Sequence, residues 1–188
     1  MKNYEIVAVG VSAGGLEALS CIVPNLPASF SLAMIIVQHI REDADGFLPD
    51  YINIKSALPV QEAMDKEPIL PGTIYIAPAN YHLLVEEDRT FGLSTESRVN
   101  WSRPSIDLLF ESVADVYGDK SIGVILTGAN DDGSMGLKKI KEFGGLAIVQ
   151  DPETALYGLM PKAALQAVQP DRVLKLEEIA PFLATYII

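Results

Sequence analysis

The sequence predicts a doubly wound α/β fold: a mostly parallel sheet with helices on both faces and a β-hairpin extension. Short, continuously apolar runs recur along the chain, and each is followed by Gly, Asn, Asp or His. Segments with a helical apolar period of 3.6 residues separate most of these runs. Continuous apolar strands that alternate with helices are typical of a parallel sheet buried on both faces.

The predicted strands are short apolar or β-branched runs bounded by turn residues. They cover residues 6–9, 32–37, 58–62, 73–77, 82–85, 91–94, 122–126, 146–149 and 172–174. Pro59 predicts an edge position for its strand, because proline cannot donate to a neighbouring strand. The runs 82–85 and 91–94 flank the polar stretch Glu86-Glu87-Asp88-Arg89 and are predicted to form the hairpin.

The predicted helices cover residues 16–23, 47–56, 105–117, 135–143, 162–168 and 176–186. The most regular pattern is that of 105–117, whose apolar positions are Ile106, Leu109, Phe110, Val113 and Ala114. Gly144-Gly145 predicts the end of the helix before it, because glycine commonly terminates helices.

Length and composition limit the class of protein. A chain of 188 residues, 49% of them hydrophobic, predicts one globular domain over residues 1–188. The formal net charge of −11, without a basic run, disfavours nucleic-acid binding, which needs Lys and Arg against phosphates. The single cysteine, Cys21, excludes an intrachain disulfide. Without a secretion signal or an apolar run of the ~18 residues that a membrane span requires, we expect a cytoplasmic protein with no membrane insertion.

The most informative motif is Gly10-Val11-Ser12-Ala13-Gly14-Gly15, between the first predicted strand and the first predicted helix. The spacing Gly-x-Ser-x-Gly at a strand-to-helix turn is that of a nucleophile elbow, which exposes a serine hydroxyl at the edge of a sheet. A serine hydrolase is therefore the first hypothesis, and it requires a base and an orienting acid elsewhere in the chain.

Suitable partners follow two other predicted strands. His39 follows the second strand, and Asp131 and Asp132 follow the run 122–126. Because sites in open α/β sheets form outside the carboxyl ends of the strands, we expect these residues to meet Ser12. A neutral imidazole can take the serine proton, and a carboxylate can orient the imidazole. Spacing does not separate Asp131 from Asp132, and either could instead cap the following helix.

The second histidine, His82, is a rival base, although a structural role is the favoured interpretation for it. A dinucleotide site is disfavoured, because Ser12 occupies the second glycine position of G-x-G-x-x-G and Gln38-His39 ends the second strand in place of an acidic residue. No lysine follows the glycines as a phosphate-binding P-loop would require, and no clustered ligand spacing predicts a metal. We expect no cofactor. The order Ser12, His39, Asp132 also differs from the Ser-acid-His order of α/β-hydrolases.

With these residues identified, nearly the whole chain resembles the catalytic domain of the CheB-type chemotaxis receptor methylesterases, the protein-glutamate methylesterase family. The similar segments are residues 6–15 with the Gly-x-Ser-x-Gly-Gly turn, 37–39 with Gln-His, and 126–133 with Leu-Thr-Gly…Asp-Gly. Residues 70–72, 76–78 with His82, 103–107, 150–151 and 160–161 also fit. The resemblance implies Ser12 as nucleophile, His39 as base, and Asp132 rather than Asp131 as the acid.

The resemblance also implies a function. It implies hydrolysis of glutamate methyl esters on methyl-accepting chemotaxis-type receptors, and deamidation of receptor glutamines through the same acyl-enzyme. Ala13, Ala129 and Asn130 are the expected oxyanion and substrate loop residues. Ala129 and Asn130 replace the Met and Gly of the best-known members, and Leu159 replaces a common Gly, which predicts differences in substrate fit and rate.

The same resemblance raises the question of regulation. The chain begins at the first strand of the catalytic domain, so we expect no receiver domain. A receptor methyltransferase or a separate response regulator is an expected partner. The alternative functions are a non-catalytic regulatory or binding module that retains the fold, and a hydrolase that acts on small esters.

Overall fold

The computed structural model describes residues 3–39 and 47–186 of the chain. The strands are β1 (Ile6–Val11), β2 (Ala33–Gln38), β3 (Val60–Glu62), β4 (Ile74–Ile76), β5 (His82–Val85), β6 (Phe91–Ser94), β7 (Ser121–Ile125), β8 (Leu146–Gln150) and β9 (Arg172–Leu174). The helices are α1 (Gly15–Ile22), α2 (Phe47–Asn53), α3 (Ile106–Tyr117), α4 (Ser134–Glu142), α5 (Leu159–Ala167) and α6 (Leu176–Leu183). Short 3₁₀ turns lie at Val23–Asn25, Gly118–Lys120 and Ala184–Tyr186.

In the described part of the chain, the strands form one parallel sheet in the order β3-β4-β2-β1-β7-β8-β9 and a separate antiparallel pair, β5 and β6. The predicted doubly wound α/β fold with a hairpin extension is therefore confirmed. The strand that contains residue 60 lies at the sheet edge, as Pro59 predicts.

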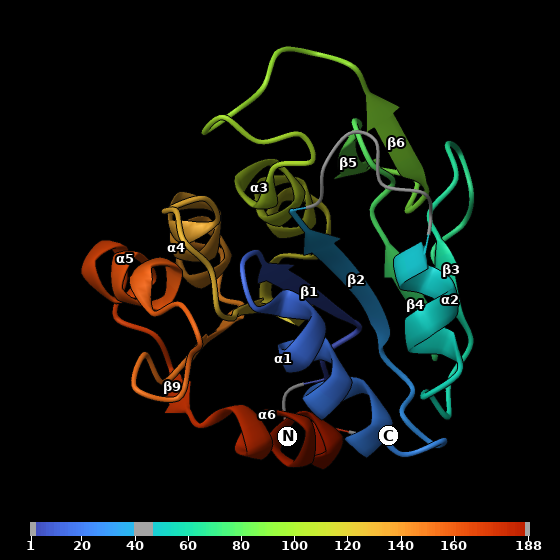
Figure 1. The fold of residues 1–188 in the computed structure, drawn as a ribbon. Helices are drawn as coiled ribbons and strands as arrows, with labels where there is room; N and C mark the ends of the chain where they lie inside the picture. Colours follow the sequence, from blue (N-terminus) through green and yellow to red (C-terminus); the bar gives the residue numbers. More distant parts are fainter. Residues whose placement is uncertain (1–2, 40–46, 187–188) are drawn as a thin grey trace.

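Helices cover both faces of the sheet (Figure 1). Alternate residues of β1 point to opposite faces: Val7 and Val9 belong to one core, and Ile6 and Ala8 to the other. The first core packs against α1, α2 and α6, and the second against α3, α4, α5 and the hairpin. Because both faces are buried, β1, β2, β7 and β8 are buried along their whole length.

The strand order indicates a place for a binding site near the centre of the sheet. From β1 the chain passes to β2, then to the edge strand β3 and back to β4 between them, and from β7 it moves outward in the opposite direction through β8 to β9. The strand order thus reverses between the neighbours β1 and β7. Binding sites in open α/β sheets form at such a reversal, outside the carboxyl ends of the strands.

The predicted boundaries differ from the structure mainly at the helix ends. The helix predicted at 162–168 begins at Leu159, because Pro161 lies in its first turn, where no intrahelical N–H donor is needed. The helix predicted at 47–56 ends at Asn53, and that predicted at 176–186 continues beyond Leu183 only as a 3₁₀ turn. Ser105 caps α3, since its Oγ accepts a hydrogen bond from the N–H of Leu108.

None of the helices in the described residues is both long and apolar enough to cross a bilayer.

The close approach of α3 and α4 generates a stability prediction. A Cβ at Gly136 would lie 2.6 Å from the Cβ of Phe110 and 2.9 Å from the carbonyl oxygen of Asp107. On an exposed helix surface, Gly→Ala stabilises by about 1 kcal/mol. For Gly136→Ala we expect the opposite sign, a loss of about 1–3 kcal/mol in the free energy of unfolding, because two helix backbones would have to separate. Urea unfolding measures this, with Met135→Ala on the exposed face of α4 as the control; a stabilised Gly136→Ala protein would contradict the contact.

Candidate active site

Ser12 stands directly after β1, at the turn into α1. Its N–H donates to the carbonyl oxygen of Thr127 at 3.0 Å, which ties the turn to the end of β7. Gly14 has a φ of 79°, a left-handed conformation that glycine adopts without steric cost. A Cβ at Gly14 would also lie 3.0 Å from the Cβ of Leu156. Backbone angle and packing therefore both require glycine here, and the turn keeps Ser12 at the carboxyl edge of the sheet.

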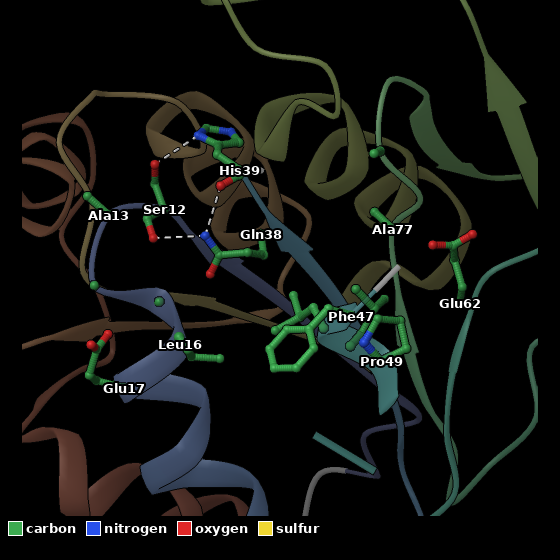
Figure 2. Close-up of a pocket in the computed structure, with 15 residues that line it drawn as sticks. Ser12, Ala13, Leu16, Glu17, Gln38, His39, Phe47, Pro49, Glu62 and Ala77 are labelled. Atoms are coloured by element: carbon green, nitrogen blue, oxygen red, sulfur yellow. Dashed lines mark hydrogen bonds between the residues drawn. The ribbon is translucent and has the colours of Figure 1, made fainter. Parts of the chain in front are cut away.

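Gln38 joins the ends of β1 and β2. Its Nε2 donates to the carbonyl oxygens of Ser12 and His39, each at 2.9 Å, as the dashed lines in Figure 2 show. A Cβ at Gly15 would lie 1.7 Å from Oε1 of Gln38, so glycine is required beside this bridge. The N–H of His39 donates to the carbonyl oxygen of Val11 at 3.0 Å. The separation of Ser12 and His39 is thus set by the main chain.

The imidazole of His39 lies between Ser12 and Asp132. Its Nδ1 is 3.2 Å from Oγ of Ser12, and its Nε2 is 2.8 Å from Oδ2 of Asp132. An ionised carboxylate only accepts hydrogen bonds, so Nε2 carries the hydrogen and the lone pair of Nδ1 faces the serine. The three side chains therefore form a continuous chain of hydrogen bonds that can accept a proton from the hydroxyl.

Asp132 is fully buried and accepts hydrogen bonds from five donors. Its Oδ2 accepts from Nε2 of His39 at 2.8 Å and from the N–H of Ile106 at 2.7 Å. Its Oδ1 accepts from Oγ of Ser105 at 3.0 Å, from Nδ2 of Asn100 at 3.1 Å and from the N–H of Asp107 at 3.2 Å. Burial alone would raise the pKa of Asp132, but the hydrogen bonds from His39 and Ile106 hold this pKa below its usual value. Two of the donors are N–H groups at the start of α3, where the helix favours a negative charge.

The neighbouring aspartate, Asp131, is exposed and borders a different surface depression, beside α5. The structure thus places Asp132, and not Asp131, against His39.

The adjacent residue Asn130 also reaches the imidazole. Its Oδ1 accepts from the N–H of Asp132 at 3.3 Å, so its Nδ2 is the group that lies 3.2 Å from Nδ1 of His39.

Two further predicted site residues border Ser12 and the loop after β7. Ala13 is half-buried beside the nucleophile position, and its carbonyl oxygen accepts from Oγ1 of Thr127 at 2.9 Å. Among the described residues, the N–H of Ala13 has no hydrogen-bond partner. Ala129 is exposed at the tip of the loop that follows β7. The structure therefore leaves a backbone N–H beside Ser12 available to a bound molecule.

His82 has no part in this hydrogen-bonded chain. It is fully buried, its Nε2 lies 3.0 Å from the carbonyl oxygen of Ser97, and its Nδ1 accepts from the N–H of Ser105 at 3.2 Å. Both ring nitrogens are therefore engaged by the backbone, which agrees with the structural interpretation of this histidine. Within the described ranges, no three His, Cys, Asp or Glu side chains are grouped as a metal would require.

A cavity of about 580 Å³ opens beside Ser12 and His39. Leu16, Phe47 and Pro49 give it apolar walls, and the exposed residues Glu17 and Glu62 also border it. Figure 2 shows Ser12 and His39 across the cavity from Phe47 and Pro49. Most ligand sites have this combination of apolar walls and a few converging polar groups.

One residue at the centre of the site, Asn100, is not predicted by any sequence pattern. Its Nδ2 donates to Oδ1 of Asp132 at 3.1 Å and to Oδ2 of Asp107 at 2.8 Å, and so bridges two carboxylates. It lies between β6 and α3, where no periodic pattern exists. Its nearness to residues 103–107, which the resemblance had selected, was the one available signal.

Comparisons with known proteins agree with this fold. Residues 7–183 match the family model described as CheB methylesterase. A Leptospira interrogans protein, provisionally named protein-glutamate methylesterase/protein-glutamine glutaminase, is 56% identical over 182 residues, which cover 95% of this chain and 92% of that protein. A Pseudomonas aeruginosa protein-glutamate methylesterase/protein-glutamine glutaminase is 42% identical, over 97% of this chain and 54% of that protein. The crystal structure of the Thermotoga maritima CheB methylesterase catalytic domain superposes with a TM-score of 0.92 at 36% identity, over 97% of this chain and 98% of that one.

The second buried carboxylate, Asp107, generates a prediction about pH. Burial raises its pKa to about 6, and the nearby charge of Asp132 adds to the effect, against hydrogen bonds from the N–H of Gly136 and from Asn100. The folded protein therefore holds this proton more tightly than the unfolded chain. Its contribution to stability is present at low pH and is lost as the pH rises towards the folded pKa, a loss of about 2–3 kcal/mol in the free energy of unfolding.

Urea unfolding of the wild type and of Asp107→Asn at pH 4.5 and pH 7.5 measures this contribution. The amide that this substitution introduces would face the Nδ2 group of Asn100, a cost that does not vary with pH. We expect the stability of the wild type relative to the variant to fall between the two pH values. A difference that stays constant, or that grows with pH, would contradict the raised pKa.

Proposed function

The chain belongs to the CheB methylesterase family, and from that premise we propose that it is a serine hydrolase that demethylates glutamate methyl esters on chemotaxis or related sensory receptors. The observation that carries the proposal is the hydrogen-bonded chain Ser12–His39–Asp132 at the mouth of the cavity. The names of the similar proteins support a methylesterase and glutaminase activity.

Acylation begins when Oγ of Ser12 attacks the ester carbonyl carbon. Nδ1 of His39 takes the hydroxyl proton as the Oγ–C bond forms, and Asp132 stabilises the imidazolium through Nε2–H. The tetrahedral intermediate collapses, and His39 returns the proton to the departing methoxy group, which leaves as methanol. The side chain of the substrate glutamate remains bound to Ser12 as an ester.

The oxyanion of the tetrahedral intermediate forms beside the start of α1. The N–H of Ala13 supports it, in the favourable field of the helix N-terminus. Nδ2 of Asn130 lies beside Nδ1 of His39 and is the candidate second donor, with the exposed Ala129 shaping the loop that carries it. A donor aimed at an oxyanion is typically worth about 10²–10³ in kcat.

Deacylation uses the same groups in reverse. Water replaces the leaving group, His39 takes a proton from it, and its oxygen attacks the acyl carbon. The bond between the acyl carbon and Oγ of Ser12 then breaks, His39 returns the proton to Oγ, and the glutamate carboxylate is released. A receptor glutamine enters the same route with ammonia as the leaving group, so the methylesterase and glutaminase activities share one acyl-enzyme.

The cavity favours a neutral substrate over a charged product. A methyl ester is uncharged and presents a methyl group to the apolar walls at Leu16, Phe47 and Pro49. The carboxylate product carries a negative charge, and the exposed residues Glu17 and Glu62 also border the cavity. Repulsion between these like charges, which salt screens, favours departure of the product over its retention.

The partners of this reaction are methyl-accepting receptors and, as the source of the ester, a receptor methyltransferase; a separate response regulator is a candidate regulator. We place the reaction in the cytoplasm, in line with the expectation from the sequence.

Removing the nucleophile tests the function. We expect Ser12→Ala to lower methanol release from a methyl-labelled receptor by about 10⁴ or more, because no acyl-enzyme can form. Ammonia release from receptor glutamines should fall equally. Ser20→Ala, on α1 away from the cavity, is the control and should retain both activities. Methanol release by Ser12→Ala at the wild-type rate would overturn the proposal.

The adjacent aspartates provide a matched pair of variants. Asp132→Asn leaves one acceptor oxygen for five donors and turns an NH₂ group towards some of them, so the imidazole loses its orientation and its compensating charge. We expect kcat for methanol release to fall by about 10³–10⁴, while Asp131→Asn changes it less than twofold. Equal losses in the two variants, with both proteins folded by circular dichroism, would exclude a specific role for Asp132.

A further inference from the structure

The segment between β6 and α3 presents the most exposed large apolar side chain among the described residues. Trp101 is the only tryptophan of the chain, and it is 93% exposed. Single exposed apolar side chains are common on folded surfaces, so the backbone at this position and its place relative to the active site decide whether the indole has a function.

The backbone at Trp101 is itself unfavourable for a bulky residue. Val99 and Ser102 exchange two backbone hydrogen bonds, of 3.1 and 2.8 Å, around a two-residue turn. Both central residues are left-handed, with φ of 49° at Asn100 and 63° at Trp101. Turns of this kind favour Asn followed by Gly, and a bulky residue at the second position is strained. The chain thus places an indole where glycine would fit better, and such outliers point to function.

Hydrogen bonds from two side chains, Arg103 and His82, hold the chain that flanks the turn. Nη1 of Arg103 donates to the carbonyl oxygens of Thr95 and Glu96, at 2.8 and 3.0 Å, and its Nε and Nη2 donate to Oδ1 of Asn80. The buried His82 engages the carbonyl oxygen of Ser97. The indole is therefore displayed on a braced support, and a rigid aromatic side chain loses little conformational entropy when it binds a partner.

The same turn is tied to the active site. Nδ2 of Asn100, the residue before Trp101, donates to Asp132, which in turn accepts from His39. Three hydrogen bonds therefore connect the base of the turn to Oγ of Ser12. Figure 1 shows the segment between β6 and α3 on the side of the molecule towards which the arrowheads of β1 and β2 point.

We propose that the turn Val99–Ser102 is a docking element for the protein substrate, in which the indole of Trp101 packs against the receptor segment that flanks the esterified glutamate. The inference rests on the proposed function, because a side chain that belongs to a protein reaches Ser12 only if the flanking chain covers this edge of the sheet. A single buried aromatic anchor often carries much of the affinity of such a contact.

A comparison of two substrates tests the docking element. For Trp101→Gly we expect kcat/KM on a methylated receptor fragment, relative to kcat/KM on a small activated ester such as p-nitrophenyl acetate, to fall about tenfold, mainly through KM. The unfolding temperature should stay equal or rise, because glycine relieves the left-handed strain. Ile54→Ala, which removes an 85% exposed apolar side chain from the end of α2, is the matched control and should leave the ratio unchanged. A ratio within twofold of the wild type in Trp101→Gly would overturn the proposal.

A second measurement does not depend on catalysis. In Ser12→Ala, Trp101 is still the only tryptophan, so its emission reports directly on the turn. With methylated receptor cytoplasmic fragments we expect the emission to shift to shorter wavelength and iodide quenching to decrease. Unchanged emission with every fragment would overturn the docking element. A shift that appears with protein concentration alone would also overturn it, in favour of contact between two copies of the chain. Failure of the proposed function is distinguishable, since it appears as absent methanol release from the wild type.

Discussion

The carboxylate of Asp132 is the interaction on which the candidate site depends. A buried charge is tolerated only where hydrogen bonds replace its lost hydration. Here the donors come from the residue after β2, from the segment before α3, and from the first N–H groups of α3 itself. Satisfying this single carboxylate therefore brings His39 and the segment 100–107 to Asp132, three parts of the chain that are distant in sequence, and it fixes the imidazole of His39 with Nδ1 towards Ser12.

The neighbouring carboxylates of Asp132 and Asp107 would repel each other if both were ionised. Their environments shift their two pKa values in opposite directions. Asp132 receives five donors, which hold its pKa down in spite of burial, whereas burial dominates at Asp107 and raises its pKa to about 6. The negative charge is thus most stable on the residue that contacts His39. Asn100 lies between the two and donates to both, so it screens the repulsion that remains.

Sequence patterns predicted those parts of the site that depend on regular structure. Ser12 and His39 directly follow buried parallel strands, and the topology of such sheets brings strand ends together. Spacing could not separate Asp131 from Asp132, because a shift of one residue in an irregular loop decides which side chain is buried; the family resemblance favoured Asp132, and the structure places that residue against His39. Asn100 escaped prediction for a related reason. Its role follows from an irregular segment that folds back over α3, and no local pattern encodes such a contact.

The features of this structure that lower its stability lie around the candidate active site. The core on both faces of the sheet is apolar and regular, so it follows the local preferences of its residues. Around Asp132, by contrast, two carboxylates are buried together and an indole occupies a left-handed position in full contact with water. Stability alone would remove each of these features. All of them meet at Asn100, which contacts both carboxylates and precedes the indole. We therefore regard this residue as the link between the charge that orients His39 and the surface that a protein substrate would contact.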